Sequence, residues 1–227
     1  MSGQGALPPQ GHQGGAGPSA GSRGEGAHHP RSLADVPIRP AATVLLLRTA
    51  PSGLEVFVQT RASGMEFAPD VTVFPGGGIE PSDDGDLRVT AARETHEECG
   101  VRVDPDALVP LSRWVTPPGR PRRYDTMFYL AALPAGQDAR CVTTEAVSAG
   151  WLGPQAVIDA WLAGRNKLMA PTYSQLHQLL PFETVEDVLG WAAEAADLTP
   201  VAIVDGMRRE DRRFPGYEQY AAGATIY

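Results

Sequence analysis

Three glutamates and an arginine lie close together near the middle of the chain, at the spacing of one helical face. Glu94, Glu97 and Glu98 follow Arg93 by one, four and five residues. Because residues three and four apart on a helix are surface neighbours, the three carboxylates are expected to face the same way. Clustered carboxylates repel one another unless a cation lies among them, and Mg²⁺ or Mn²⁺ prefers oxygen ligands. The pattern therefore predicts a divalent metal site whose remaining ligands include substrate phosphates.

The flanking residues predict the elements that hold these side chains. Apolar stretches with β-branched residues predict strands at residues 42–48, 54–61, 71–74, 124–133 and 201–204, and further extended segments at 101–103 and 108–115. A helix is predicted from Leu87 to Cys99, with Gly100 as its C-terminal stop. The glycines Gly76 to Gly78 come before it and predict a turn facing the glutamates. Further helices are expected at residues 154–163, 172–180 and 184–196. Strands interrupted by helices predict an α/β class with a mixed sheet between helical layers.

The stretch from Gly77 to Val101 resembles the Nudix box, Gly-x5-Glu-x7-Arg-Glu-U-x-Glu-Glu-x-Gly-U, in which U is a bulky apolar residue. Its second half matches at Arg93, Glu94, Glu97, Glu98, Gly100 and Val101. In the first half, Asp83 takes the place of Glu, and nine rather than seven residues separate it from Arg93. This indicates a two-residue insertion in the loop at residues 81–86. A solvated acidic helix face is the alternative interpretation of the glutamates, and the glycine turn and Arg93 disfavour it.

The resemblance implies a Nudix hydrolase with an α/β/α sandwich, a mixed β-sheet and additional C-terminal helices. It also implies that Glu94, Glu97 and Glu98 bind Mg²⁺ or Mn²⁺, with the backbone carbonyl of Gly77 or Gly76 as a further ligand. Arg93 would orient the glutamates, and Glu94 and Glu97 would take part in catalysis. A catalytic base in this family can also come from a later loop. Glu145 is the candidate there, and an exposed loop glutamate is an equally weighted alternative.

Candidate substrate contacts lie on both sides of the box: Arg61, Gly76, Arg122, Arg123 and Tyr124. Arg122 and Arg123 directly precede a predicted strand, so one of them could bind a phosphate. A solvated basic turn is the alternative for this pair. Tyr124 or Trp114 could stack on a base, although core packing is the commoner role of a single aromatic residue.

The run from Arg61 to Gly77 resembles the signature of the CoA and acyl-CoA diphosphatase branch and its bacterial homologues, without a gap. Glu66 stands where that signature has Arg, and Asp70 where it has Gly. CoA or an acyl-CoA is therefore the expected substrate, with ADP-ribose or another nucleoside-diphosphate derivative as the alternative. A catalytically silent Nudix-fold binding or regulatory module is the alternative from another class. Such modules generally lose box glutamates, and all three are present in this chain.

The composition limits the remaining possibilities. The 227 residues are predicted to form a disordered Gly/Pro-rich tail (1–36), a Nudix domain (37–165) and a mainly helical extension packed on it (166–227). A net charge of −8 argues against a nucleic-acid partner, including a decapping substrate. No apolar run of about 18 residues predicts a membrane span, and no apolar leader precedes the domain, so a cytoplasmic location is expected. The resemblance also raises the expectation of a homodimer.

Overall fold

Apolar alternation along the first strand sets the architecture. β1 (Ile38–Ala50) directs Val44 and Leu46 to one face of the sheet and Leu45 and Leu47 to the other, because successive side chains of a strand point to opposite faces. All four side chains are fully buried, so both faces of the sheet are covered. The computed structural model, which describes residues 36–62, 70–144, 146–202 and 214–223, shows the covering layers.

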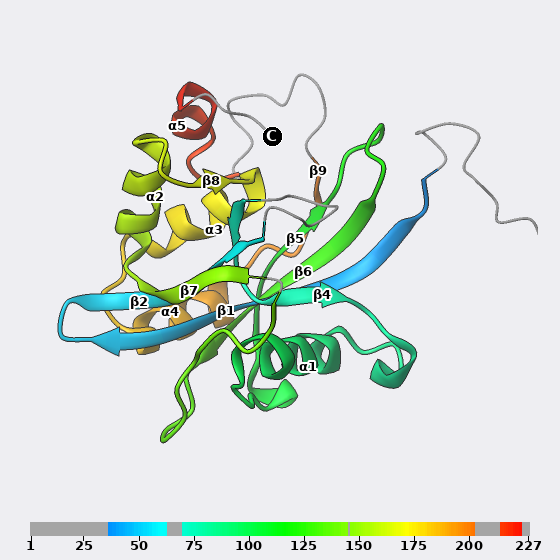
Figure 1. The fold of residues 1–227 in the computed structure, drawn as a ribbon, viewed down its shortest axis with the longest axis horizontal. Coiled ribbons are helices and arrows are strands. Elements are labelled where there is room, and N and C mark those ends of the chain that lie inside the picture. The colour runs from blue at the N-terminus through cyan, green and yellow to red at the C-terminus, as the bar shows by residue number, and fades with distance from the viewer. Residues whose placement is uncertain (1–35, 63–69, 145, 203–213, 224–227) are drawn as a thin grey trace, which may run out of the picture. The chain divides into compact units, whose positions relative to one another are not determined.

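The sheet is mixed, with β1 near its centre (Figure 1). One edge of β1 pairs antiparallel with β2 (Gly53–Arg61) and, further back along the strand, with β4 (Gly76–Gly78). The other edge runs parallel to β6 (Arg123–Ala132). Among the described strands the main order is β8-β3-β2-β1-β6-β5-β9, with β7 paired to β2. The remaining strands are β3 (Val71–Val73), β5 (Val109–Val115), β7 (Ala146–Leu152), β8 (Lys167–Leu168) and β9 (Val201–Ala202).

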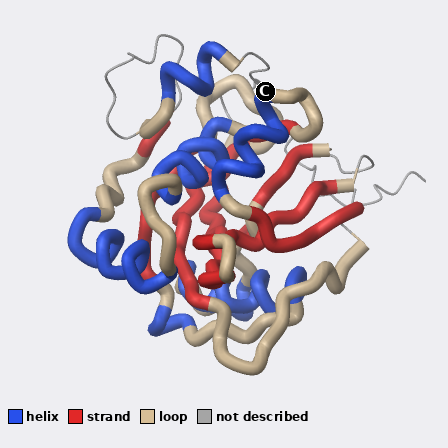
Figure 2. Tube along the Cα trace, turned by 90° about the vertical axis from the view of Figure 1, so that its left-hand side faces the viewer, coloured by secondary structure: helices blue, strands red, loops and turns tan. Residues whose placement is uncertain are grey.

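Helices cover both faces of the sheet (Figure 2). On one face, α1 (Leu87–Cys99) packs Ala91 and Cys99 against Val44 and Leu46 of β1. Within the described residues, the helices on the opposite face share a core cluster with Leu45; they are α2 (Pro154–Leu162), α3 (Ala170–Leu179), α4 (Val185–Ala195) and α5 (Tyr217–Ala222). Two short 3-10 helices, η2 (Pro81–Asp83) and η3 (Pro105–Ala107), lie on either side of α1 in the sequence. The predicted α/β/α sandwich with a mixed sheet is confirmed.

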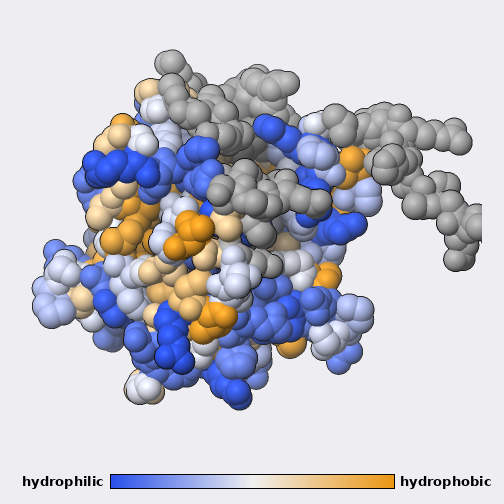
Figure 3. Space-filling view, viewed as in Figure 1, coloured by the Kyte–Doolittle hydropathy of each residue, from blue (hydrophilic) through white to orange (hydrophobic). Residues whose placement is uncertain are grey.

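The structure differs from the predicted elements in several places, and two short elements, β8 and α5, were not predicted. The predicted turn at Gly76–Gly78 forms the short strand β4, which pairs with β1. β7 was not among the predicted strands, because its sequence is dominated by small residues rather than by an alternating β-branched pattern. Its side chains Val147 and Leu152 are exposed, and Figure 3 shows apolar surface in the part of this face where β2 and β7 lie.

The structure describes only part of the N-terminal and C-terminal segments. The predicted disordered tail lies outside the described residues, apart from Val36. The C-terminal helices α3 and α4 contribute Leu176 and Val188 to the same core cluster as β1. The predicted boundary between domain and extension at residue 165 stays a prediction. Within the described ranges, each helix is too short or too polar to cross a bilayer.

Candidate functional site

The loop between β4 and α1 contains Asp83, the residue that stands where the Nudix box has its first glutamate. η2 buries Asp83, whose side chain is 1% exposed. Its Oδ2 accepts hydrogen bonds from the backbone N of Glu80 at 2.8 Å and from Thr90 Oγ1 at 2.9 Å. The two residues that follow, Asp84 and Gly85, have φ angles of 49° and 81°. This left-handed pair forms a turn between Asp83 and α1, and we infer that it accommodates the two-residue insertion.

The start and end of α1 follow ordinary capping chemistry. Asp86 is the N-cap, and its side chain accepts a hydrogen bond from the backbone N of Arg88. Gly100 ends the helix with a φ of 73°, as the sequence predicted. Thr95, which stands where the Nudix box usually has a larger apolar residue, is fully buried and donates its hydroxyl to the carbonyl of Ala91 at 2.7 Å. The helix therefore keeps the length and phase that place its glutamates on one side.

Arg93 links the loop acid, the glycine strand and two of the glutamates. Its Nε and Nη2 donate to the two carboxylate oxygens of Asp83 at 2.9 and 3.0 Å, which is a bidentate pair. Its Nη1 donates to Glu94 Oε1 and to Glu97 Oε2, both at 3.0 Å. Its Nη2 also donates to the carbonyl of Gly78 at 3.1 Å. The hydrogen bond from Arg93 is the main reason that the pKa of Asp83 is lowered to about 2.

The glycines of β4 are explained by close packing. A Cβ on Gly77 would lie 2.2 Å from Glu94 Oε1, and a Cβ on Gly76 would lie 2.4 Å from the carbonyl oxygen of Ala42. Both positions therefore exclude a side chain in this arrangement. The contact brings the backbone of β4 against the Glu94 carboxylate, whose pKa is raised by burial. β4 and α1 thus meet at the carboxylate that the sequence marked as a metal ligand.

Glu98 faces a different pair of donors. Gln59 Nε2 on β2 donates to Glu98 Oε2 at 2.5 Å, and the backbone N of Gly76 donates to the same oxygen at 3.1 Å. Gln59 is only 4% exposed. Gln59 was not among the predicted site residues, although a polar residue directly after the apolar run at residues 56–58 was a usable signal.

The box residues offer oxygen ligands of the kind that a divalent cation prefers. Within the described residues, no three His, Cys, Asp or Glu side chains converge closely enough to hold a metal ion. Glu94 and Glu97 share Arg93 Nη1, whereas Glu98 turns toward Gln59 and Gly76. The chemistry of the donors fits a hard cation, because all of them are oxygens. Because Gly77 has no side chain, the β4 backbone can also lie close to the Glu94 carboxylate. The assignment of Glu94, Glu97, Glu98 and Gly77 as ligands stays a prediction.

Comparison with known families identifies the domain. The family model described as "NUDIX domain" matches residues 37–175, which is more than half of the chain. The chain belongs to the NUDIX domain family. The predicted membership is thereby confirmed.

Individual relatives agree with this assignment. A protein of Caenorhabditis elegans named "Putative nudix hydrolase 7" is 25% identical over an alignment of 187 positions that covers 66% of this chain and 62% of that protein. The match thus spans less than two thirds of that relative. The crystal structure of a NUDIX hydrolase from Alicyclobacillus acidocaldarius superposes with a TM-score of 0.63 at 26% identity, covering 73% of this chain and 99% of the other.

The predicted substrate residues lie on two parts of this Nudix domain. Arg61 is at the end of β2, two residues beyond Gln59, so it lies close to the Glu98 end of the site. Arg123 and Tyr124 begin β6, opposite the first two residues of β1. Both are tied to the loop that follows β5, since Arg123 Nε donates to the Thr116 carbonyl at 3.1 Å and the Tyr124 backbone N donates to Thr116 Oγ1 at 3.0 Å.

The remaining candidates are Arg122, Trp114 and Glu145. Arg122 is exposed just before β6. Trp114 is buried at 3% exposure and packs edge-on against Phe214, so it belongs to the core rather than to a base-stacking surface. Glu145, the candidate base from a later loop, lies outside the described residues. Its role in this Nudix domain stays a prediction.

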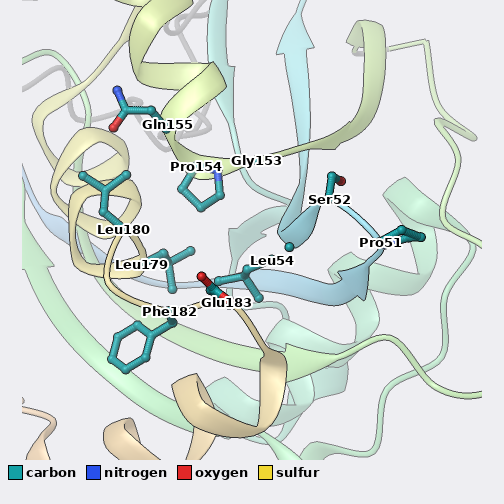
Figure 4. A pocket seen from close by; sticks show the side chains of 11 residues that line it. Pro51, Ser52, Leu54, Gly153, Pro154, Gln155, Leu179, Leu180, Phe182 and Glu183 are labelled. Carbon is teal, nitrogen blue, oxygen red and sulfur yellow. The ribbon is translucent and has the colours of Figure 1, made fainter.

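A hollow of about 360 Å³ has a lining made of other residues than those of the box (Figure 4). It lies between the β1–β2 hairpin, the start of α2 and the segment after α3, and its lining includes Ser52, Leu54, Pro154, Leu180 and Phe182. These residues belong to the side of the sheet opposite α1, whereas the box glutamates project from α1. This hollow therefore contains none of the predicted site residues.

Proposed function

We propose that this Nudix domain is a metal-dependent hydrolase that cleaves the diphosphate linkage of a nucleoside-diphosphate derivative, with CoA or an acyl-CoA as the leading substrate. The observation that carries the proposal is the arrangement around Arg93. One guanidinium holds Asp83 bidentately and holds both Glu94 and Glu97 at 3.0 Å beside the glycine strand. An acidic helix face that served only solubility would not need a buried acid and a backbone carbonyl to fix its arginine.

The residues of the chain take distinct parts in this chemistry. Glu94, Glu97 and Glu98, with the Gly77 carbonyl, would hold Mg²⁺ or Mn²⁺. When bound, such an ion neutralises diphosphate charge and activates water. Arg93 keeps Glu94 and Glu97 in place for that task by donating to both. Glu94 or Glu97, or Glu145 from the later loop, would accept the proton of the attacking water.

The proposal of CoA or acyl-CoA rests on the resemblance of the run from Arg61 to Gly77 to that branch. One departure from its signature agrees with the required backbone shape. Asp70 replaces a glycine there, and it has a φ of 59°. This is the left-handed conformation that glycine adopts freely and that Asp tolerates better than most residues. Arg61, Arg122, Arg123, Gly76 and Tyr124 are the proposed substrate contacts, and ADP-ribose or another nucleoside-diphosphate derivative is the alternative substrate.

A substrate panel tests this proposal. Purified protein is incubated with CoA, acetyl-CoA, a long-chain acyl-CoA, ADP-ribose, NADH, sugar nucleotides, a dinucleoside polyphosphate and nucleoside triphosphates, with and without Mg²⁺ or Mn²⁺. Products are identified by mass spectrometry. Metal-dependent release of 3′,5′-ADP and a phosphopantetheine product supports the CoA proposal. Cleavage of ADP-ribose instead retains the chemistry and rejects the branch. Absence of cleavage with retained metal binding indicates a substrate outside the panel, whereas absence of both cleavage and metal binding favours a silent Nudix-fold module.

We also propose a homodimer that acts on small molecules rather than on nucleic acid. The net charge of −8 supports the choice of a small substrate, because a nucleic-acid surface needs a basic footprint. Size-exclusion chromatography with light scattering reads the oligomeric state directly, and a monomeric mass rejects the dimer. Retention on RNA at moderate salt would contradict the choice of a small-molecule partner.

A further inference from the structure

Gln59 is a buried polar side chain that directly follows three buried apolar residues of β2, Val56, Phe57 and Val58. Its neighbours Phe57 and Val58 are 1% and 4% exposed and belong to the two core clusters on opposite faces of the sheet. Because side chains alternate along a strand, Gln59 lies on the same face as Phe57, which is the face covered by α1. A buried amide at such a place costs free energy unless it is hydrogen-bonded.

The amide of Gln59 finds its partner in Glu98. Its Nε2 donates to Glu98 Oε2 at 2.5 Å, across 39 residues of sequence. The backbone N of Gly76 donates to the same oxygen at 3.1 Å. An ionised carboxylate only accepts, so the amide must present its nitrogen here. Donors from β2 and β4 therefore fix one oxygen of Glu98 from two directions, and the bond to the charged oxygen is of the stronger, charge-assisted kind.

The hydrogen-bond donors to Glu98 thus differ from the donor to Glu94 and Glu97. Glu94 and Glu97 are held from within the box by Arg93. Glu98 is held by Gly76 and by Gln59, which lies well before the box in the sequence. We propose that Gln59 is a positioning residue that orients the Glu98 carboxylate for metal binding. This inference rests on the proposed function, because it assigns Glu98 as a ligand.

The substitution Gln59→Met tests the proposal, since it keeps an unbranched side chain of similar length and removes the donor. Residues that orient metal ligands typically contribute 10–100-fold to metal affinity or activity, so Gln59→Met should weaken Mn²⁺ binding by roughly that factor. Binding is measured without substrate, by calorimetry or by electron paramagnetic resonance of free Mn²⁺. In the turnover assay, kcat should fall while KM for the substrate changes little.

The chain offers a matched control. Gln155 Nε2 donates to Asp159 Oδ1 at 2.7 Å on the exposed surface of α2, so Gln155→Met removes the same kind of bond away from the box. This variant should leave both Mn²⁺ affinity and turnover unchanged. Circular dichroism checks the fold of each variant. If Gln59→Met fails to fold, Gln59→Asn keeps the amide but shortens its reach by one methylene, and it should weaken Mn²⁺ binding in the same direction.

A double-mutant cycle with Glu98→Gln separates positioning from a general structural effect. If Gln59 acts through Glu98, Gln59→Met should cause little further loss of Mn²⁺ affinity once Glu98 is replaced. An equal loss in both backgrounds overturns the proposal, as does unchanged Mn²⁺ affinity in Gln59→Met. A wild-type protein that binds Mn²⁺ but cleaves no diphosphate rejects the proposed function alone, because the titration still decides the role of Gln59. A wild-type protein that does not bind Mn²⁺ overturns both.

Discussion

Two arginine–aspartate pairs in this chain share a bidentate geometry but not their surroundings. Arg93 holds Asp83 through Nε and Nη2 at 2.9 and 3.0 Å. Arg113 of β5 holds Asp125 of β6 through the same two nitrogens at 2.7 and 2.5 Å. The side chains of the first pair are 16% and 1% exposed, and those of the second are 42% and 24% exposed. Arg93 also donates to two glutamates and a backbone carbonyl.

The difference shows that the geometry of an ion pair alone does not tell whether its arginine holds several elements of the site together. An exposed pair gains little, because water already solvates both charges. A buried acid that loses its arginine is left with an uncompensated charge. The Arg93 pair therefore constrains the loop, the glycine strand and the glutamates together, whereas the Arg113 pair fastens two neighbouring strands at the surface.

The largest stability difference is expected when the same change is made in each pair. Asp83→Ala leaves the Arg93 guanidinium without its bidentate partner and should cost about 3–5 kcal/mol of unfolding free energy. Asp125→Ala should cost only about 0–1 kcal/mol. Urea unfolding of both variants gives the two values. Equal costs would show that burial does not distinguish the pairs.

A second change disturbs the buried cluster without touching its charges. Gly77→Ala places a methyl group 2.2 Å from the present position of Glu94 Oε1, so the carboxylate must move. A displacement of about 1 Å in a catalytic arrangement can cost on the order of 100-fold in rate, and a loss of that order is expected in kcat. Gly78→Ala is the matched control, because its Cβ would meet only the Pro40 carbonyl at 3.9 Å. Equal rates in the two variants would mean that the Glu94 position is unimportant.

The unfolding free energy should also depend on pH through Asp83. The pKa of Asp83 is lowered to about 2, chiefly by its hydrogen bond from Arg93. A lowered carboxyl pKa contributes stability that is fully present above the unfolded value of about 4 and is lost as the pH falls toward 2. Asp83→Asn should remove this part of the pH dependence. Urea unfolding between pH 7 and pH 2.5 reads it, and an unchanged slope between pH 4 and pH 2.5 in the variant would contradict the assignment.

The smallest effect is expected at the surface pair. Arg113→Leu should change the unfolding free energy by about 0–1 kcal/mol, because the pair is solvent-exposed. Turnover should be unchanged, since Arg113 is not among the proposed substrate contacts. Steady-state kinetics checks this, and a clear rise in KM would place the Arg113 pair in the substrate site.

The fold was predictable where local rules decide it. The helix from Leu87 to Cys99 was predicted at both ends, because its periodicity and the stop at Gly100 agree. β7 was not, since its small residues gain their strand conformation from pairing with β2 rather than from intrinsic preference. β4 was expected as a turn for a similar reason, because β1 supplies the partner that makes it a strand.

The candidate site was predictable only within one stretch of sequence. Arg93 and Glu97 are four residues apart, so their contact follows the helix period and could be foreseen. The contact of Arg93 with the adjacent Glu94 does not follow from this period. The contact between Gln59 and Glu98 joins elements 39 residues apart, and no local pattern encodes it. The partnership of Asp83 with Arg93 was partly visible, since Asp83 keeps its distance from Gly77 despite the insertion that follows.

The most direct test is the metal-dependent cleavage of the best panel substrate by wild-type protein, Glu97→Gln and Glu194→Gln. Glu194 is an exposed residue of α4 and serves as the matched control. If the α1 glutamates perform the chemistry, Glu97→Gln should lower kcat by roughly 10²–10⁴-fold while the fold persists, and Glu194→Gln should match wild type. An unchanged rate in a folded Glu97→Gln variant would contradict the assignment of this helix face as the catalytic centre.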